Sequence, residues 1–208
     1  RQWIDRADDS ARARFLAEMR RPYAEGSAQT LLTDMLHGAE DDAAQMAGLR
    51  RARNLGQAVI AARALGGLAS LDETMAATSA LADASLRQAL DMADQAVRGR
   101  FGTPRDAEGK PVCPVVIGMG KLGGGELNFS SDVDLMLFYT AAGESDGERS
   151  VANEIWFAKL AQAFTRLLAE QTADGFVYRV DWALRPFGKS GPPAMHFAAA
   201  EDYYQAHG

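Results

Sequence analysis

Two aspartates stand one residue apart at the start of an apolar run, DVDLMLFY, at residues 132–139. If this run is a β-strand, alternation places Asp132 and Asp134 on one face, about 6.6 Å apart along the strand. Like charges on one half-buried face repel each other and are costly to desolvate. A divalent cation shared between them removes that cost, and carboxylate oxygens suit Mg²⁺ or Mn²⁺. We therefore predict that both aspartates are catalytic residues and metal ligands.

A third carboxylate follows in FVYRVDWALRP, residues 176–186, where alternation predicts another strand over 176–184. Asp181 shares its predicted face with Arg179 and Arg185. We expect Asp181 to join the first two aspartates, across adjacent strands, as a catalytic residue and metal ligand. Both arginines are expected to bind phosphate oxygens, which match the geometry of a guanidinium group. Three carboxylates, a divalent metal and arginines are typical of phosphoryl or nucleotidyl transfer.

A glycine-rich turn, GMGKLGGG at residues 118–125, leads into the strand of the aspartates. Its glycines would let backbone N–H groups approach a phosphate, and a helix starting there would add its positive end. The turn is not a dinucleotide fingerprint, because it runs into a second strand, and no Gly-Lys-Ser/Thr of a Walker A loop occurs. A DxD pair or a glycine run alone is usually surface charge or loop, but their adjacency favours a site. The residues predicted to bind nucleotide or phosphate here are Gly118, Gly120, Lys121, Gly123 and Gly124.

The elements that must position these residues change in type near residue 100. The first hundred residues are rich in Ala, Leu, Met and Arg, which favours helices, and Ser70 with Glu73 fits a capping box. After them, a segment rich in Gly, Pro and charge at 101–114 is typical of a linker, and alternating or helical periodicity follows. The predicted helices are 7–20, 40–65, 71–98 and 151–171, and the predicted strands are 115–117, 132–139 and 176–184.

Composition limits the partners and the compartment. A net charge of −6 argues against sequence-independent binding to nucleic acid, which needs a cationic surface. No apolar run approaches the ~18 residues of a membrane-spanning helix, so we expect no membrane partner. Cys113 is the only cysteine, which leaves no intrachain disulfide and favours a reducing, cytoplasmic compartment. Because the sequence begins at Arg1 and not at Met, we expect it to be part of a longer protein.

The motifs resemble the signature of glutamine synthetase adenylyltransferase, a large bifunctional enzyme that adds AMP to a tyrosine of glutamine synthetase and removes it. The resemblance begins at GMGKLGGGEL and SDVDL, residues 118–127 and 131–135, and covers most of 112–208. It resumes at DGFVYRVD, LRPFG, SGP and EDYYQ, which are residues 174–181, 184–188, 190–192 and 201–205. The helical first half is similar to the lead-in of that family.

This resemblance implies an α+β fold. It implies a nucleotidyltransferase domain of the DNA polymerase β type, with a small mixed sheet and helices, at 115–208. A helical subdomain at 1–100 and a linker at 101–114 would precede it. The family carries two such domains in one chain, and the motifs of 174–205 are similar to the N-terminal, deadenylylating half. The implied reaction is phosphorolysis, in which inorganic phosphate releases ADP from adenylylated glutamine synthetase.

The same resemblance implies the site and the partners. Asp132, Asp134 and Asp181 would hold the metal ions, and the turn with Lys121 would hold the nucleotide phosphates. Glutamine synthetase would be the protein substrate, ADP or ATP and inorganic phosphate the small ligands, and a PII-type signal protein a further partner. Ala183 departs from the family, which usually has arginine at this position, so one cation for phosphate is missing.

Two alternatives stay open at this point. The motifs of 118–135 occur in both halves of the family, so the chain could carry the adenylylating half, which uses ATP and releases pyrophosphate. It could instead be a non-catalytic regulatory module that docks a signal protein or glutamine synthetase. The presence of all three carboxylates speaks against the docking module, which has no need of them.

Overall fold

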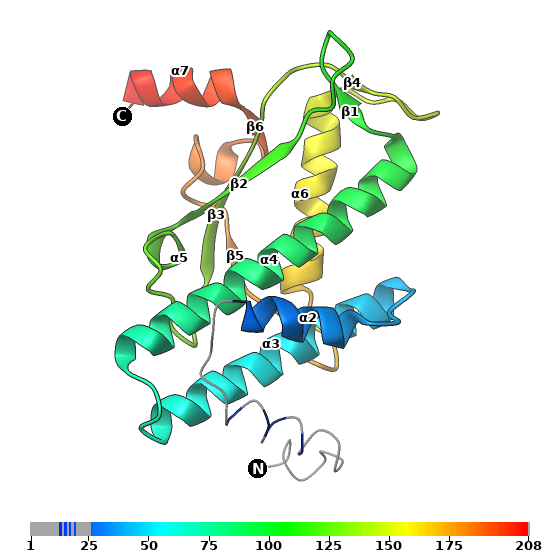
Figure 1. Cartoon of the computed structure of the whole chain (residues 1–208). Helices are drawn as coiled ribbons and strands as arrows, with labels where there is room; N and C mark the ends of the chain where they lie inside the picture. The colour runs from blue at the N-terminus through cyan, green and yellow to red at the C-terminus, as the bar shows by residue number, and fades with distance from the viewer. Residues whose placement is uncertain (1–12, 14, 16, 18, 20–25, 208) are drawn as a thin grey trace. The chain divides into compact units, whose positions relative to one another are not determined.

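The computed structural model describes residue 13, residue 15, residue 17, residue 19 and residues 26–207 (Figure 1). It is an α+β structure, as predicted, and it divides into two compact units. The first unit contains residues 1–85 and 125–129, and the second contains residues 86–124 and 130–208. This boundary falls inside helix α4, Leu71–Phe101. The predicted domains at 1–100 and 115–208, joined by a linker at 101–114, stay a prediction.

The first unit is helical. It contains α2 (Ser27–Leu36), α3 (Asp42–Leu65) and the first half of α4, whose apolar sides bury Leu32, Leu49 and Leu81 completely. The predicted helices 40–65 and 71–98 are therefore confirmed, with ends shifted by a few residues, whereas α2 was not predicted. The helix predicted at 7–20 lies mostly outside the described residues.

The caps of these helices follow local chemistry. Asp41 accepts a hydrogen bond from the Ala44 amide at 2.7 Å and so caps α3. The Ser70 hydroxyl accepts one from the Glu73 amide at 3.1 Å, which confirms the serine half of the predicted capping box. Glu73 also pairs with the buried Arg63, whose Nη2 lies 2.9 Å from Glu73 Oε1.

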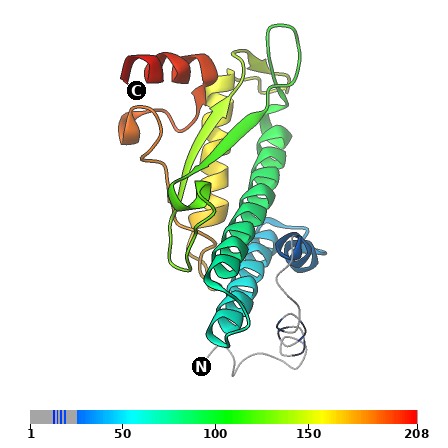
Figure 2. The same cartoon turned by 60° about the vertical axis from the view of Figure 1, so that its left-hand side comes forward.

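The second unit is built around one strand, β3 (Val133–Tyr139). Strand β2 (Pro114–Met119) pairs antiparallel with β3 from Pro114 opposite Tyr139 to Met119 opposite Asp134. Two short strands pair parallel with β3 at its two ends: β5 (Val180–Asp181) with its first two residues and β6 (Met195–His196) with its last two. The predicted strands 115–117 and 132–139 are thus confirmed, and β2 is longer than predicted (Figure 2).

One face of β3 is buried against α6 (Asn153–Ala169), which lies along the sheet in Figures 1 and 2. Val133, Leu135 and Leu137 are at most 2% exposed. Tyr139, on the same face, stacks on Phe157 of α6 with ring centroids 4.6 Å apart. The predicted helix at 151–171 is confirmed, and each end is two residues shorter than predicted. Its contact with β3 determines which side chains of the strand point away from the core.

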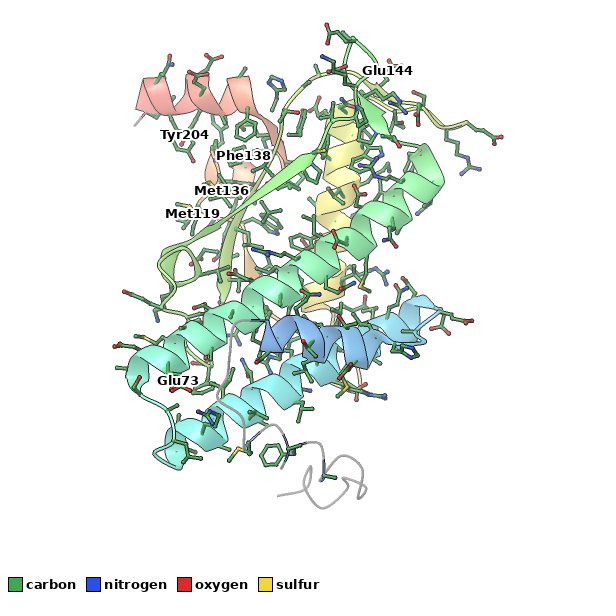
Figure 3. All side chains as sticks on the ribbon, viewed as in Figure 1. Glu73, Met119, Met136, Phe138, Glu144 and Tyr204 are labelled. Atoms are coloured by element: carbon green, nitrogen blue, oxygen red, sulfur yellow. The ribbon has the colours of Figure 1, made fainter. Side chains whose placement is uncertain are left out.

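The opposite face of β3 is covered at only one end. There, Met136 and Phe138 pack with Met195 and with Ala200 of α7 (Phe197–His207). Phe138 stacks on Phe197, the first residue of α7, with centroids 5.4 Å apart. Figure 3 shows Met119 of β2, Met136 and Phe138 of β3, and Tyr204 of α7 on this side of the sheet. Neither α7 nor β6 was predicted from the sequence.

The strand predicted over 176–184 is wrong in its length, because only Val180 and Asp181 form β5. The amides of Val177 and Tyr178 both donate to the Leu168 carbonyl, at 2.8 and 3.1 Å, which ties this segment to the end of α6. After the strand, Asp181 Oδ1 accepts from the Ala183 amide at 2.7 Å and turns the chain away. The backbone amides in these bonds are therefore not available to extend the hydrogen bonding between β5 and a neighbouring strand.

The segment predicted as a linker carries a strand of its own. Strand β1 (Pro104–Arg105) pairs antiparallel with β4 (Glu144–Ser145). Arg105 Nε lies 2.6 Å from Asp146 Oδ2, and this guanidinium hydrogen bond holds the pKa of the Asp146 carboxyl below its usual range. Trp156 of α6 donates to the Gly102 carbonyl at 3.0 Å, which joins the segment to the core of the unit.

Within the described part of the chain, no helix combines the length and the apolar character needed to cross a membrane.

The packing of α6 gives a prediction. Phe164 is fully buried in this helix, whereas Ile155 on the same helix is 49% exposed. We expect Phe164→Ala to lower the free energy of unfolding by about 3–5 kcal/mol through lost burial and a cavity. The matched variant Ile155→Ala should change it by no more than about 0.5 kcal/mol. Urea unfolding followed by tryptophan fluorescence measures both, and an equal loss in the two variants would contradict this burial of α6.

Candidate active site

The three predicted carboxylates lie at one end of the sheet, on the face away from α6. Asp134 of β3 is directly opposite Asp181 of β5 in the parallel register, so their side chains project to the same side. Asp132 precedes β3 by one residue and shares that side by alternation. Asp132 and Asp181 are exposed and Asp134 is half-buried. The structure therefore places all three on one accessible face, as the period-two pattern predicted.

Asp132 forms an ion pair with an arginine that directly precedes the neighbouring strand β5. Arg179 Nε donates to Asp132 Oδ1 at 2.6 Å, and its Nη2 donates to the Ser130 carbonyl at 3.2 Å. The main chain reinforces this contact, since the Val133 amide donates to the Arg179 carbonyl at 2.9 Å. The Arg179 guanidinium also lies 5.8 Å from the centre of the Phe176 ring. Arg179 is thus a counter-ion of a predicted metal ligand as well as a predicted phosphate ligand.

The glycine turn comes directly against the carboxylates. It begins after Met119, which pairs with Asp134, and contains the short helix α5 (Gly120–Gly123). Gly120 has a φ of +54°, and a Cβ added there would lie 2.6 Å from Asp134 Oδ2. A Cβ on Gly123 would lie 2.6 Å from the Gly118 carbonyl oxygen. Contact with a backbone oxygen therefore favours glycine at position 123, and at position 120 the positive φ favours glycine while a Cβ would have to move the Asp134 carboxylate, in both cases independently of any phosphate.

The predicted phosphate role of this turn stays a prediction. Helix α5 has only four residues, so its aligned peptide dipoles add little positive potential at its start. Lys121 is an exposed residue of α5 and carries a full positive charge. Gly124 donates its amide back to the Gly120 carbonyl at 3.0 Å, so this N–H group is used within the turn. The cation of Lys121 is therefore the strongest contribution of the turn to binding an anion.

Arg185 lies elsewhere in the unit, because β5 ends at Asp181 and the face predicted over 179–185 does not persist. Its guanidinium donates to three backbone carbonyls: Trp182 at 3.0 Å, Gly191 at 3.1 Å and Lys189 at 3.4 Å. With Trp182 it borders an open groove of about 850 Å³ along α6, which is the helix on the opposite face of the sheet. Arg185 holds the loop after β5 together, and its predicted contact with phosphate stays a prediction.

The three aspartates offer the oxygen donors that suit a hard divalent cation. Asp134 and Asp181 offer carboxylate oxygens side by side, and Asp132 offers another on the same face. Among the described residues, however, no three His, Cys, Asp or Glu side chains are already grouped closely enough to hold a metal ion. Asp132 is instead hydrogen-bonded to Arg179. Binding of Mg²⁺ or Mn²⁺ therefore stays a prediction, with these three residues as its ligands.

Sequence reasoning missed the pairing of Arg179 with Asp132. Each residue immediately precedes one of the in-register valines, Val133 and Val180, so alternation puts the two side chains on the same face. Period-two patterns in the sequence indicate each face correctly. They do not reveal which residue of one strand stands beside which residue of the other, and this register creates the ion pair.

Acidic residues at the end of a sheet, beside a glycine turn and cations, form the class of site that phosphoryl and nucleotidyl transfer uses. The family model described as glutamate-ammonia ligase adenylyltransferase matches residues 7–208, and the chain belongs to this family.

Three relatives align with most of this chain. Each of the following is a bifunctional glutamine synthetase adenylyltransferase/adenylyl-removing enzyme. The protein from Thioalkalivibrio sulfidiphilus is 48% identical over 90% of this chain, that from Stenotrophomonas maltophilia (strain R551-3) 49% over 78%, and that from Shewanella loihica 44% over 89%. The aligned regions make up 19%, 17% and 20% of these relatives, so the chain spans about a fifth of their length.

The close approach of the turn to Asp134 gives a second prediction. In Gly120→Ala the new Cβ must displace the Asp134 carboxylate, and φ of +54° adds about 1–2 kcal/mol of backbone strain. The matched variant Gly109→Ala has φ of +78° with open space around it, so it carries the strain alone. We expect both variants to lose similar stability in thermal melts. Only Gly120→Ala should also weaken Mn²⁺ binding, measured by electron paramagnetic resonance, and equal Mn²⁺ affinity in both would refute the contact.

Proposed function

We propose that this chain carries a nucleotidyl-transfer site that removes AMP from the adenylylated tyrosine of glutamine synthetase by phosphorolysis. The observation that carries the proposal is the in-register pair of Asp134 and Asp181, with Asp132 on the same face, next to the glycine turn. Support for the substrate comes from the relatives, whose name, bifunctional glutamine synthetase adenylyltransferase/adenylyl-removing enzyme, joins the two activities. Support for the removing direction is the resemblance of residues 174–205 to that half of the family.

In this reaction the protein has to position the reacting groups and stabilise their negative charge. An oxygen of inorganic phosphate attacks the phosphorus of the adenylyl group, the bond from phosphorus to the tyrosyl oxygen breaks, and that oxygen takes up a proton. The products are ADP and unmodified tyrosine. Mg²⁺ or Mn²⁺, when bound, supplies positive charge to the reacting phosphoryl oxygens.

The residues of the chain have separate tasks in this proposal. Asp134 and Asp181 would hold the cation from adjacent strands, and Asp132 would complete the ligand set. Lys121, exposed at the glycine turn, binds phosphate oxygens of the nucleotide. Arg179 stands one residue before β5, in contact with Asp132, and would bind phosphate oxygens as well. Arg185, whose guanidinium is held by carbonyl oxygens, contributes to the shape of the loop.

The experiment that tests the direction supplies the 208-residue chain with adenylylated glutamine synthetase, Mg²⁺ and ³²P-labelled phosphate. Labelled ADP is the expected product. A parallel reaction with unmodified glutamine synthetase and α-³²P-ATP tests the adenylylating half, which would instead label the protein. Turnover in neither reaction, together with binding of glutamine synthetase, would favour a docking module. A PII-type partner and a cytoplasmic location are further parts of the proposal.

The role of the carboxylates gives a third prediction. Asp134→Asn should lower the rate of labelled ADP formation at least about 100-fold, since a neutral amide cannot supply the charge that holds the metal, and each ~1.4 kcal/mol of transition-state stabilisation is tenfold in rate. In the absence of metal its melting temperature should stay the same or rise, because the repulsion between Asp134 and Asp181 is relieved. Asp202→Asn, which alters an exposed aspartate of α7, is the control for both measurements.

The opposite result would identify a structural residue. A clear fall in the metal-free melting temperature of Asp134→Asn, together with full activity, would mean that Asp134 serves the sheet and the turn alone.

A further inference from the structure

We propose that Arg179 is a displaceable counter-ion. It neutralises Asp132 in the metal-free protein, and a divalent cation displaces it, so that its guanidinium becomes available to a phosphate group. The proposal rests on the metal and phosphate sites of the proposed function, and it adds a coupling between them. In the structure the Arg179 guanidinium contacts Asp132.

Among the residues that the structure describes, Asp132 is the one carboxylate of the three with a cationic partner, and this partner, Arg179, directly precedes β5. Arg179 Nε lies 2.6 Å from Asp132 Oδ1, whereas Asp181 accepts a backbone amide in its own turn. Asp134 and Asp181 stand in register and repel each other. A cation that binds this pair therefore gains most by drawing in Asp132 as well, and it competes with Arg179 for the same oxygen atom.

The ion pair between Arg179 and Asp132 is weak enough for a cation to displace it. Arg179 is 60% exposed and Asp132 47% exposed, so water screens their attraction. Exposed ion pairs of this kind shift an equilibrium by a factor of about 1.4 to 5. A divalent cation carries twice the charge and meets three carboxylates, so it outcompetes a single guanidinium on this face.

The released side chain stays at the site, because its backbone is fixed. The Val133 amide donates to the Arg179 carbonyl at 2.9 Å, within the pairing that sets β5 beside β3. The Ser130 carbonyl at 3.2 Å and the Phe176 ring at 5.8 Å provide further contacts for the guanidinium. Five N–H donors in a planar fork match phosphate oxygens well. Binding of the cation and binding of phosphate are thereby linked through one arginine.

The first test measures Mn²⁺ affinity of the 208-residue chain by electron paramagnetic resonance. We expect Arg179→Gln to bind Mn²⁺ about two- to five-fold more tightly than the unsubstituted chain, because the competitor for Asp132 is gone. Lys189→Gln removes the same charge from an exposed side chain on the loop after β5 and should leave the affinity unchanged. Weaker binding in Arg179→Gln would mean that Arg179 only holds Asp132 in place, and an equal gain in both variants would mean a general charge effect; each result overturns the proposal.

The second test observes the arginine directly. The Nε–Hε resonance of Arg179, assigned by its loss in Arg179→Gln, should shift when saturating Mg²⁺ is added, and shift again when inorganic phosphate follows. In Asp132→Asn the Mg²⁺-dependent shift should vanish. If the unsubstituted chain binds Mn²⁺ but the Arg179 resonance does not shift with Mg²⁺, the counter-ion proposal is wrong and the metal assignment stands. A chain that binds no Mn²⁺ overturns the metal assignment of the proposed function and the exchange with it.

Discussion

The site depends on the burial of one face of β3 against α6. Val133, Leu135 and Leu137 are at most 2% exposed, and they fix the phase of the strand. A slip of one residue would exchange the two faces and drive Asp132 and Asp134 into the apolar layer of Trp156, Phe157 and Phe164, all fully buried. Burying unpaired carboxylates costs several kcal/mol each, so the alternative phase is strongly disfavoured. The position of the acidic residues follows from the apolar residues between them.

The outer face of the sheet is divided into an apolar end and a charged end. Met136 and Phe138 are covered by β6 and α7, while the first residues of the strand are left accessible. The glycine turn approaches the charged end so closely that a Cβ at Gly120 would lie 2.6 Å from Asp134 Oδ2. Two parallel strands, β5 and β6, meet opposite ends of β3, and only β5 brings a carboxylate. This division gives a small acidic site with a rigid apolar support.

The charges at this end are balanced in part by the protein itself. Arg179 forms an ion pair with Asp132. Asp134 and Asp181 stand side by side in register, and the described part of the chain shows no ion pair for either. Membership of the glutamate-ammonia ligase adenylyltransferase family fits such a site, since transfer of an adenylyl group involves highly charged phosphates. If Arg179 alternates between Asp132 and a phosphate group, as we propose, the site would respond to both proposed ligands, the divalent cation and the phosphate.

The sequence by itself predicted helices at 40–65, 71–98 and 151–171, a strand at 132–139 and the shared face of Asp132 and Asp134, because these depend on local periodicity. The structure has these elements at 42–65, 71–101, 153–169 and 133–139. It did not determine the length of β5, because the backbone amides before the strand donate to the Leu168 carbonyl. Nor did it determine the place of Arg185, whose guanidinium donates to the carbonyls of Trp182, Lys189 and Gly191. Only the tertiary structure placed Asp181 opposite Asp134 and Arg179 beside Asp132. The register of two strands far apart in the chain is set by packing and hydrogen bonds between them, and no pattern within either strand contains it.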